Sequence, residues 1–210
     1  ALATALVAVA GPVVAAEGAA SHYLPGTAGD ILIAVPPPPG FALGATAWYQ
    51  GGDVGAAVLQ GRVEAGLELD LTLGLAAGSY TTEVASLGGT YTAAVLVPFG
   101  HAKLDATTVA GPLGNTTSRS GSRSDLSDIA FVPLQLNWQV GEFAFKAAQA
   151  IIAPTGGYSI DRAINLGRNY WSFDTQGAVT WFHQATGSEV SLAPGIMFNT
   201  KNNATDYTTG

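Results

Sequence analysis

Histidine and carboxylate side chains have the widest chemical repertoire of the residues in this chain, and they are few. The three histidines, His22, His101 and His183, lie far apart and match no metal-ligand spacing such as H-E-x-x-H. His101 and Asp105 would share one face of a strand, where they could serve a hydrolase at the rim of a β-barrel. The chain has no G-x-S-x-G, P-loop or dinucleotide-binding motif. We therefore expect no catalytic site, no metal and no cofactor, and we do not expect an enzyme.

Several other charges sit in segments where polar and apolar residues alternate. Every odd position from Leu67 to Leu75 is leucine, and the even positions include Glu68 and Asp70. A period of two places the two sets on opposite faces of a β-strand. The same alternation recurs in residues 171–181 and 189–199, with tryptophan, phenylalanine and aliphatic residues on one face. Segments of about ten residues with one apolar and one polar face are typical of transmembrane β-barrels with a wet lumen.

Composition favours the same fold class. Charged residues make up 11% of the chain, whereas a soluble globular domain has about 25%. The chain has no cysteine, and 15 acidic residues outnumber 8 basic ones, so nucleic acid is not an expected partner. The expected partner is a lipid bilayer. A soluble β-sandwich stays an alternative, but it needs a second sheet to cover the aromatic faces.

The N-terminal region divides into two parts. Residues 1–16 are small or apolar and end in Val14-Ala15-Ala16, which predicts the remnant of a secretory signal peptide; a buried helix is the alternative. Residues 17–40 form an N-terminal segment, and residues 41–210 a partial β-barrel. An exported chain without a spanning helix can be a membrane protein only as a barrel.

Turn residues divide the barrel region into strands. We predict strands near residues 41–50, 62–86, 90–110, 126–140, 143–153, 169–183 and 188–199, with long loops at 51–61, 111–125 and 154–167. Short turns at 36–40, 88–89, 141–142 and 184–187 would then be periplasmic, since such barrels have short periplasmic turns and long external loops. About seven strands cannot close an even-numbered barrel. We therefore expect an N-terminal fragment that lacks the closing strands.

Residues that would line the lumen are the candidate solute contacts. If the leucines between residues 67 and 75 face lipid, the wall charges Glu64, Glu68, Asp70, Lys146 and Asp174 face the lumen, and Arg168 lies at the loop end of its strand. They could pair to stiffen the wall or line the path of a solute. The segment 21–35 is expected either to plug the lumen or to form a first wall strand. As a plug, it would offer His22, Tyr23 and Leu24 to an amphiphilic solute.

Several motifs resemble one bacterial family. The opening signature is Ser21-His22-Tyr23-Leu24-Pro25-Gly26, and further matches lie at residues 88–91, 97–100, 126–129, 135–138, 150–156, 165–171 and 193–199. Through these motifs the chain resembles the SphA-like group of MetA-pathway phenol-degradation proteins. That resemblance implies an outer-membrane transporter of a Gram-negative bacterium that takes up hydrophobic or aromatic compounds without chemistry on them.

The predicted function is thus passive transport of hydrophobic small molecules across the outer membrane. A general diffusion porin is the first alternative, although it would need a wide charged eyelet. An adhesin or purely structural barrel would have long loops rich in aromatic or charged residues. A barrel enzyme is the least favoured class. The solute, the direction of transport, the strand total and the oligomeric state do not follow from the sequence.

Overall fold

A computed structural model gives the arrangement of the chain. It describes residue 22 and residues 32–59, 62–82, 87–110, 115–162 and 164–209; at residues 50, 53–59, 62–67, 106–110, 115–117 and 119 only the backbone is described. The regular elements in this part of the chain are the strands β1 (Gly40–Leu59), β2 (Arg62–Thr81), β3 (Thr90–Ala110), β4 (Asn115–Leu126), β5 (Ile129–Val140), β6 (Phe143–Ala153), β7 (Ser172–His183), β8 (Ser188–Leu192) and β9 (Gly195–Asn199). Within these residues, no helix is long and apolar enough to cross a membrane.

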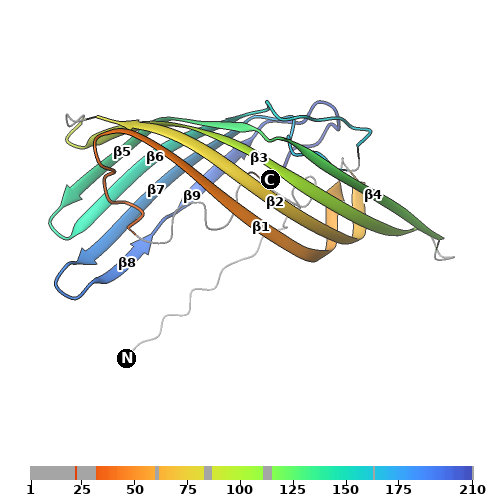
Figure 1. Ribbon diagram of the computed structural model, residues 1–210, viewed down its shortest axis with the longest axis horizontal. Helices are drawn as coiled ribbons and strands as arrows, with labels where there is room; N and C mark the ends of the chain where they lie inside the picture. The colour runs from red at the N-terminus through yellow and green to blue at the C-terminus, as the bar shows by residue number, and fades with distance from the viewer. Residues whose placement is uncertain are drawn as a thin grey trace.

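The strands form one antiparallel sheet that curls into a half-barrel (Figure 1). The strand order is β1-β2-β3-β5-β6-β7-β8. One end of β3 pairs with β5 and the other end with β4, and β7 divides in the same way between β8 and β9. The pairing of β5 shifts between Phe131 and Leu134. Pro133 lies in this irregular stretch, where a residue without an N–H group costs the sheet no regular ladder bond.

Short turns and long connections lie at opposite ends of the half-barrel (Figure 1). The turn between β5 and β6 is Gly141-Glu142, and Gly141 has a φ of 60°, which suits the first central position of a tight hairpin. At the other end, β1 with β2 and β3 with β4 form long hairpins that project past the ends of β5, β6 and β7. The predicted loops at 51–61 and 111–125 are therefore wrong, because most of both segments is strand.

The outer face of the sheet carries an apolar band. Val190 and Leu192 are both 66% exposed on it, and Leu43 is 91% exposed. Two rows of aromatic side chains border the band, as in transmembrane barrels. The row near the short turns contains Phe41, Tyr80, Phe143 and Phe145, and the row near the long connections contains Phe99, Phe131, Trp171, Phe173 and Phe198. The predicted apolar faces of residues 171–181 and 189–199 do point outward.

The leucines of β2 face inward, which corrects the predicted orientation of this strand. Leu73 pairs across the sheet with Trp48 and lies on the same face as Thr81, which is buried and bonded to Thr92. Leu71 and Leu73 pack in an internal cluster, so Glu68 and Asp70 lie on the outer face. Alternation separates two faces without saying which is internal. At this level β2 is in the projecting hairpin beyond the apolar band, so polar side chains can face outward into water.

Candidate functional site

The loop between β6 and β7, residues 154–171, folds inward across the mouth of the half-barrel. Leu166 is 7% exposed and packs with Leu73 of β2 and Ala102 of β3, on strands that are not neighbours of β6 or β7 in the sheet. Ile164 packs against the same cluster. The loop therefore narrows the mouth, and the surface that it meets on the opposite wall is apolar.

Two glycines close the base of this loop. A Cβ atom on Gly156 would lie 2.7 Å from the Cα of Gly167, so the two backbones are in direct contact. Asp128, at the corner between β4 and β5, accepts hydrogen bonds from the backbone N of Gly156 at 2.8 Å and from that of Arg168 at 2.6 Å. Ser127 Oγ donates to the carbonyl of Leu166 at 2.6 Å. The corner between β4 and β5 thus holds both ends of the loop.

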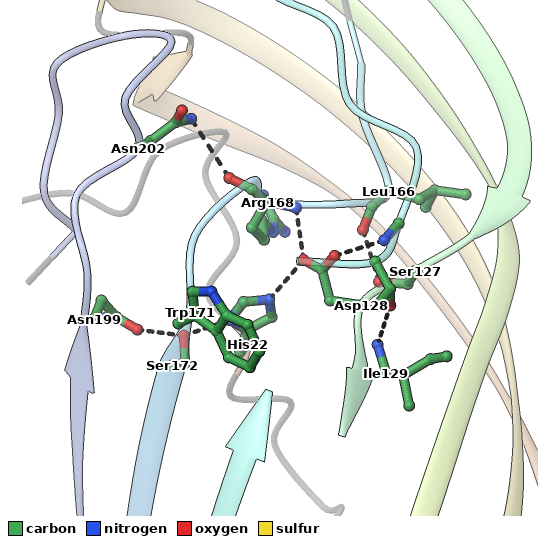
Figure 2. A network of polar contacts seen from close by, with 12 residues as sticks. His22, Ser127, Asp128, Ile129, Leu166, Arg168, Trp171, Ser172, Asn199 and Asn202 are labelled. Atoms are coloured by element: carbon green, nitrogen blue, oxygen red, sulfur yellow. Dashed lines mark hydrogen bonds and ion pairs between the residues drawn. The ribbon is translucent and has the colours of Figure 1, made fainter. Parts of the chain in front are cut away.

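His22 joins the N-terminal segment to the same corner (Figure 2). Its Nε2 lies 3.0 Å from Asp128 Oδ2, and its Nδ1 lies 2.7 Å from Ser172 Oγ. Because a carboxylate can only accept, Nε2 carries a proton. Ser172 Oγ donates in turn to Asn199 Oδ1. One histidine therefore connects the N-terminal segment with β7, with β9 and with the base of the inward loop.

Ser172, His22 and Asp128 are the residue types of a Ser-His-Asp catalytic triad, but their burial excludes nucleophilic attack by the serine. Ser172 is completely buried and its hydroxyl is bonded to Asn199, so no substrate can reach it. The Asp128 side chain is also fully buried. Burial lowers the pKa of His22 below its usual value; the hydrogen bond with Asp128 acts against this, and the charge of Arg168 adds to it. The arrangement acts as an internal cross-link.

A second part of the N-terminal segment contacts the inner face near the short turns. The backbone N of Ala34 donates to Thr180 Oγ1 at 3.2 Å, and its carbonyl accepts from Asn137 Nδ2 at 2.9 Å. Ala34 is buried against Ala144 and Ala178. Ser172 and Thr180 are separated by roughly 26 Å of β7, at about 3.3 Å per residue. The described parts of the segment therefore contact the inner wall at two distant levels.

A comparison with protein families identifies the family of the chain. The family model described as "Putative MetA-pathway of phenol degradation" matches residues 40–210, which include the strands and the inward loop. The chain belongs to this family. No curated protein matches the chain.

A solved structure supports the fold. The COG4313 outer membrane channel from Pseudomonas putida F1 superposes with a TM-score of 0.61 at 23% identity. The match covers 83% of this chain and 61% of that channel, so the chain spans less than two thirds of the length of the channel. The chain therefore has the antiparallel β-barrel fold of the outer-membrane type, of which it forms a part.

The structure separates the predicted lumen residues into several groups. Lys146 and Asp174 face inward, since they share a face with Asn137 and Ala178. The backbone of Arg168 lies at the base of the loop. Glu68 and Asp70 face outward, and Asp70 accepts a hydrogen bond from the exposed Tyr49; their predicted lumen position is wrong. The side chain of Glu64, and Tyr23 and Leu24 entirely, lie outside the described residues.

Sequence reasoning missed the residues that hold the site together. Asp128, Ser172 and Leu166 have no chemical signature of their own in the sequence. The available signal was the family resemblance, because Asp128 lies in the matching stretch 126–129 and Leu166 in 165–171. Those motifs are therefore the contacts between the wall and the inward loop.

Proposed function

We propose that the protein is an outer-membrane channel through which hydrophobic or aromatic small molecules cross passively. The observation that carries the proposal is the apolar constriction, formed by Trp48, Leu71, Leu73, Ala102, Ile164 and Leu166. An apolar solute that passes such a surface exchanges water for hydrocarbon contact, at about 25 cal/mol per Å² of area. A general diffusion porin would place charges there instead. The fold and the family support a channel, and the constriction favours apolar cargo.

The N-terminal segment is the second part of this proposal. We infer that residues 21–35 lie in the lumen as a plug, because His22 and Ala34 both contact the inner wall and β1 begins only at Gly40. Deletion of residues 21–35 from the intact protein should raise its conductance in planar bilayers. Unchanged conductance together with loss of barrel folding would show instead that the segment is part of the wall.

The constriction can be tested with a pair of leucine-to-serine variants. Leu166→Ser alters the buried loop residue, whereas Leu43→Ser alters a residue on the outer face. Block of the ionic current by benzyl alcohol in planar bilayers reports binding of a small apolar solute. We expect Leu166→Ser to weaken this block and Leu43→Ser to leave it unchanged. Equal block in both variants and the parent, with rapid permeation of arabinose into liposomes, would favour a general diffusion porin.

A further inference from the structure

Lys146 is a lysine on the inner wall of the half-barrel. It lies near the start of β6, close to the short-turn end, and pairs across the sheet with Asn137 on one side and Ala178 on the other. Both neighbours contact Ala34 of the N-terminal segment. Lys146 therefore lies on the inner surface between the apolar constriction and the periplasmic end.

In the part of the chain that the structure describes, the surroundings of Lys146 supply no matching anion. Among the described residues, no carboxylate forms an ion pair with its ammonium group and no hydrogen bond reaches it. Asp174 attracts it from a distance. The Asp174 carboxylate accepts a hydrogen bond from Gln176 Nε2 at 2.5 Å. Asp174 lies opposite Ala150 in the sheet, which is nearer the constriction than Lys146. A partly buried cation in a membrane-spanning wall, with no contact partner among the residues whose placement is described, marks a solute path.

The inner face is apolar at the mouth and positively charged farther in, which suggests a solute with one apolar end and one anionic end. At the mouth, the wall and the inward loop present leucine, isoleucine and tryptophan. Farther in, Lys146 presents a single positive charge beside the amide of Asn137. We infer that Lys146 binds the anionic group of an amphiphilic solute, namely a monoanion such as a carboxylate on an aromatic body. The inference rests on the proposed apolar route and names the chemical class that uses it.

The charge balance favours one negative charge on the solute over several. Asp174 faces the same lumen as Lys146, so a polyanion that reaches the lysine would also meet a carboxylate of its own sign. A sugar phosphate would in addition lack the apolar body that the constriction accommodates. An aromatic monocarboxylate satisfies both parts of the path.

Benzoate and benzyl alcohol form a matched pair of probes, since they share the ring and differ in charge at pH 7. Current block by each probe is measured for the intact protein in planar bilayers, with Lys146→Met, Lys146→Arg and Lys103→Met. Lys103 is paired with Asp105 on the outer face, so its variant controls for the loss of a lysine. One ion pair at about 4 Å in water corresponds to roughly a fivefold change in binding. Lys146→Met should therefore weaken block by benzoate at least about fivefold and leave block by benzyl alcohol unchanged.

Three outcomes separate the inference from the proposed function. Block by benzoate that Lys146→Arg retains and Lys146→Met loses supports binding by the lysine. If each probe blocks every variant as strongly as it blocks the parent protein, the role of Lys146 is overturned and the apolar route is left intact. If neither probe blocks the current through the parent protein, the apolar route is overturned, and the lysine inference with it.

Discussion

Asp128→Asn tests whether one buried carboxylate holds the inward loop and the N-terminal segment in place. Asp128 accepts from Gly156 N at 2.8 Å, from Arg168 N at 2.6 Å and from His22 Nε2 at 3.0 Å. In asparagine one oxygen becomes an NH₂ group, which cannot accept from a backbone N–H. Hydrogen bonds to charged groups contribute about 1.5–3 kcal/mol each, and a buried donor without a partner costs about 1–3 kcal/mol. We expect the variant to lose about 2–4 kcal/mol of unfolding free energy.

Asp125→Asn is the matched control, because Asp125 lies close in sequence but is only partly buried. It forms an ion pair with Arg123 at 2.7 Å, and such pairs contribute about 0–1 kcal/mol. Urea unfolding of the intact protein in liposomes compares the two variants. A second readout uses Leu166→Cys, since the 210 residues contain no other cysteine and Leu166 is buried. The cysteine should react with a membrane-impermeant thiol reagent on cells only when Asp128→Asn is also present. Equal stability of the two variants, with an unreactive cysteine in both, would refute the role of Asp128.

Further predictions address the orientation of the barrel, the facing of β2 and the response to acid. A cysteine in place of Ser120 should be labelled on intact cells, whereas one in place of Gly88, at a short turn, should not; the reverse pattern would invert the topology. Leu73→Arg places a guanidinium in the internal cluster and should cost about 3 kcal/mol or more, whereas the exposed Thr72→Arg should fold normally, and equal folding of the two would contradict the inward leucines. Hydrogen bonds from His183 and Trp181 lower the pKa of Glu142. Its contribution to stability is therefore fully present above the ordinary carboxyl pKa and is lost as pH falls through the lowered pKa of the folded state. The variant Glu142→Gln should therefore lose less stability on acidification than the parent protein, as urea unfolding at several pH values would show.

Local pattern predicted the spanning strands well. The predicted boundaries at residues 90–110 and 143–153 match β3 and β6, because turn residues such as Gly141-Glu142 interrupt an otherwise regular alternation. The segment 111–125 was predicted as a loop from its serines, threonines and asparagine. Its residues 115–125 belong to β4, which pairs with β3, and this shows that partner strands override the weak strand preference of polar residues.

The internal arrangement could not be predicted from the sequence. Alternation is symmetric, so Leu73 could have faced lipid or the interior. The folded sheet distinguishes the two, because Leu73 shares a face with the buried Thr81 and packs against Leu166. His22 and Asp128 are distant in sequence, and their contact depends on the curvature of the whole sheet. The predicted inward positions of Lys146 and Asp174 agree with the structure, since the preceding residues, Phe145 and Phe173, face outward in the aromatic rows that border the apolar band.

The contact between Gly156 and Gly167 closes the inward loop at its base, without the residues at its tip. The wall holds the loop at its base, so the closure of the loop is already achieved before its tip adopts any conformation. Doubling the length of a closed loop costs only about 0.6 kcal/mol of additional entropy. Relatives can therefore exchange the ten residues or so at the tip and acquire a different cargo preference while the same barrel is retained, and chimeric channels can be built by grafting at these two glycines.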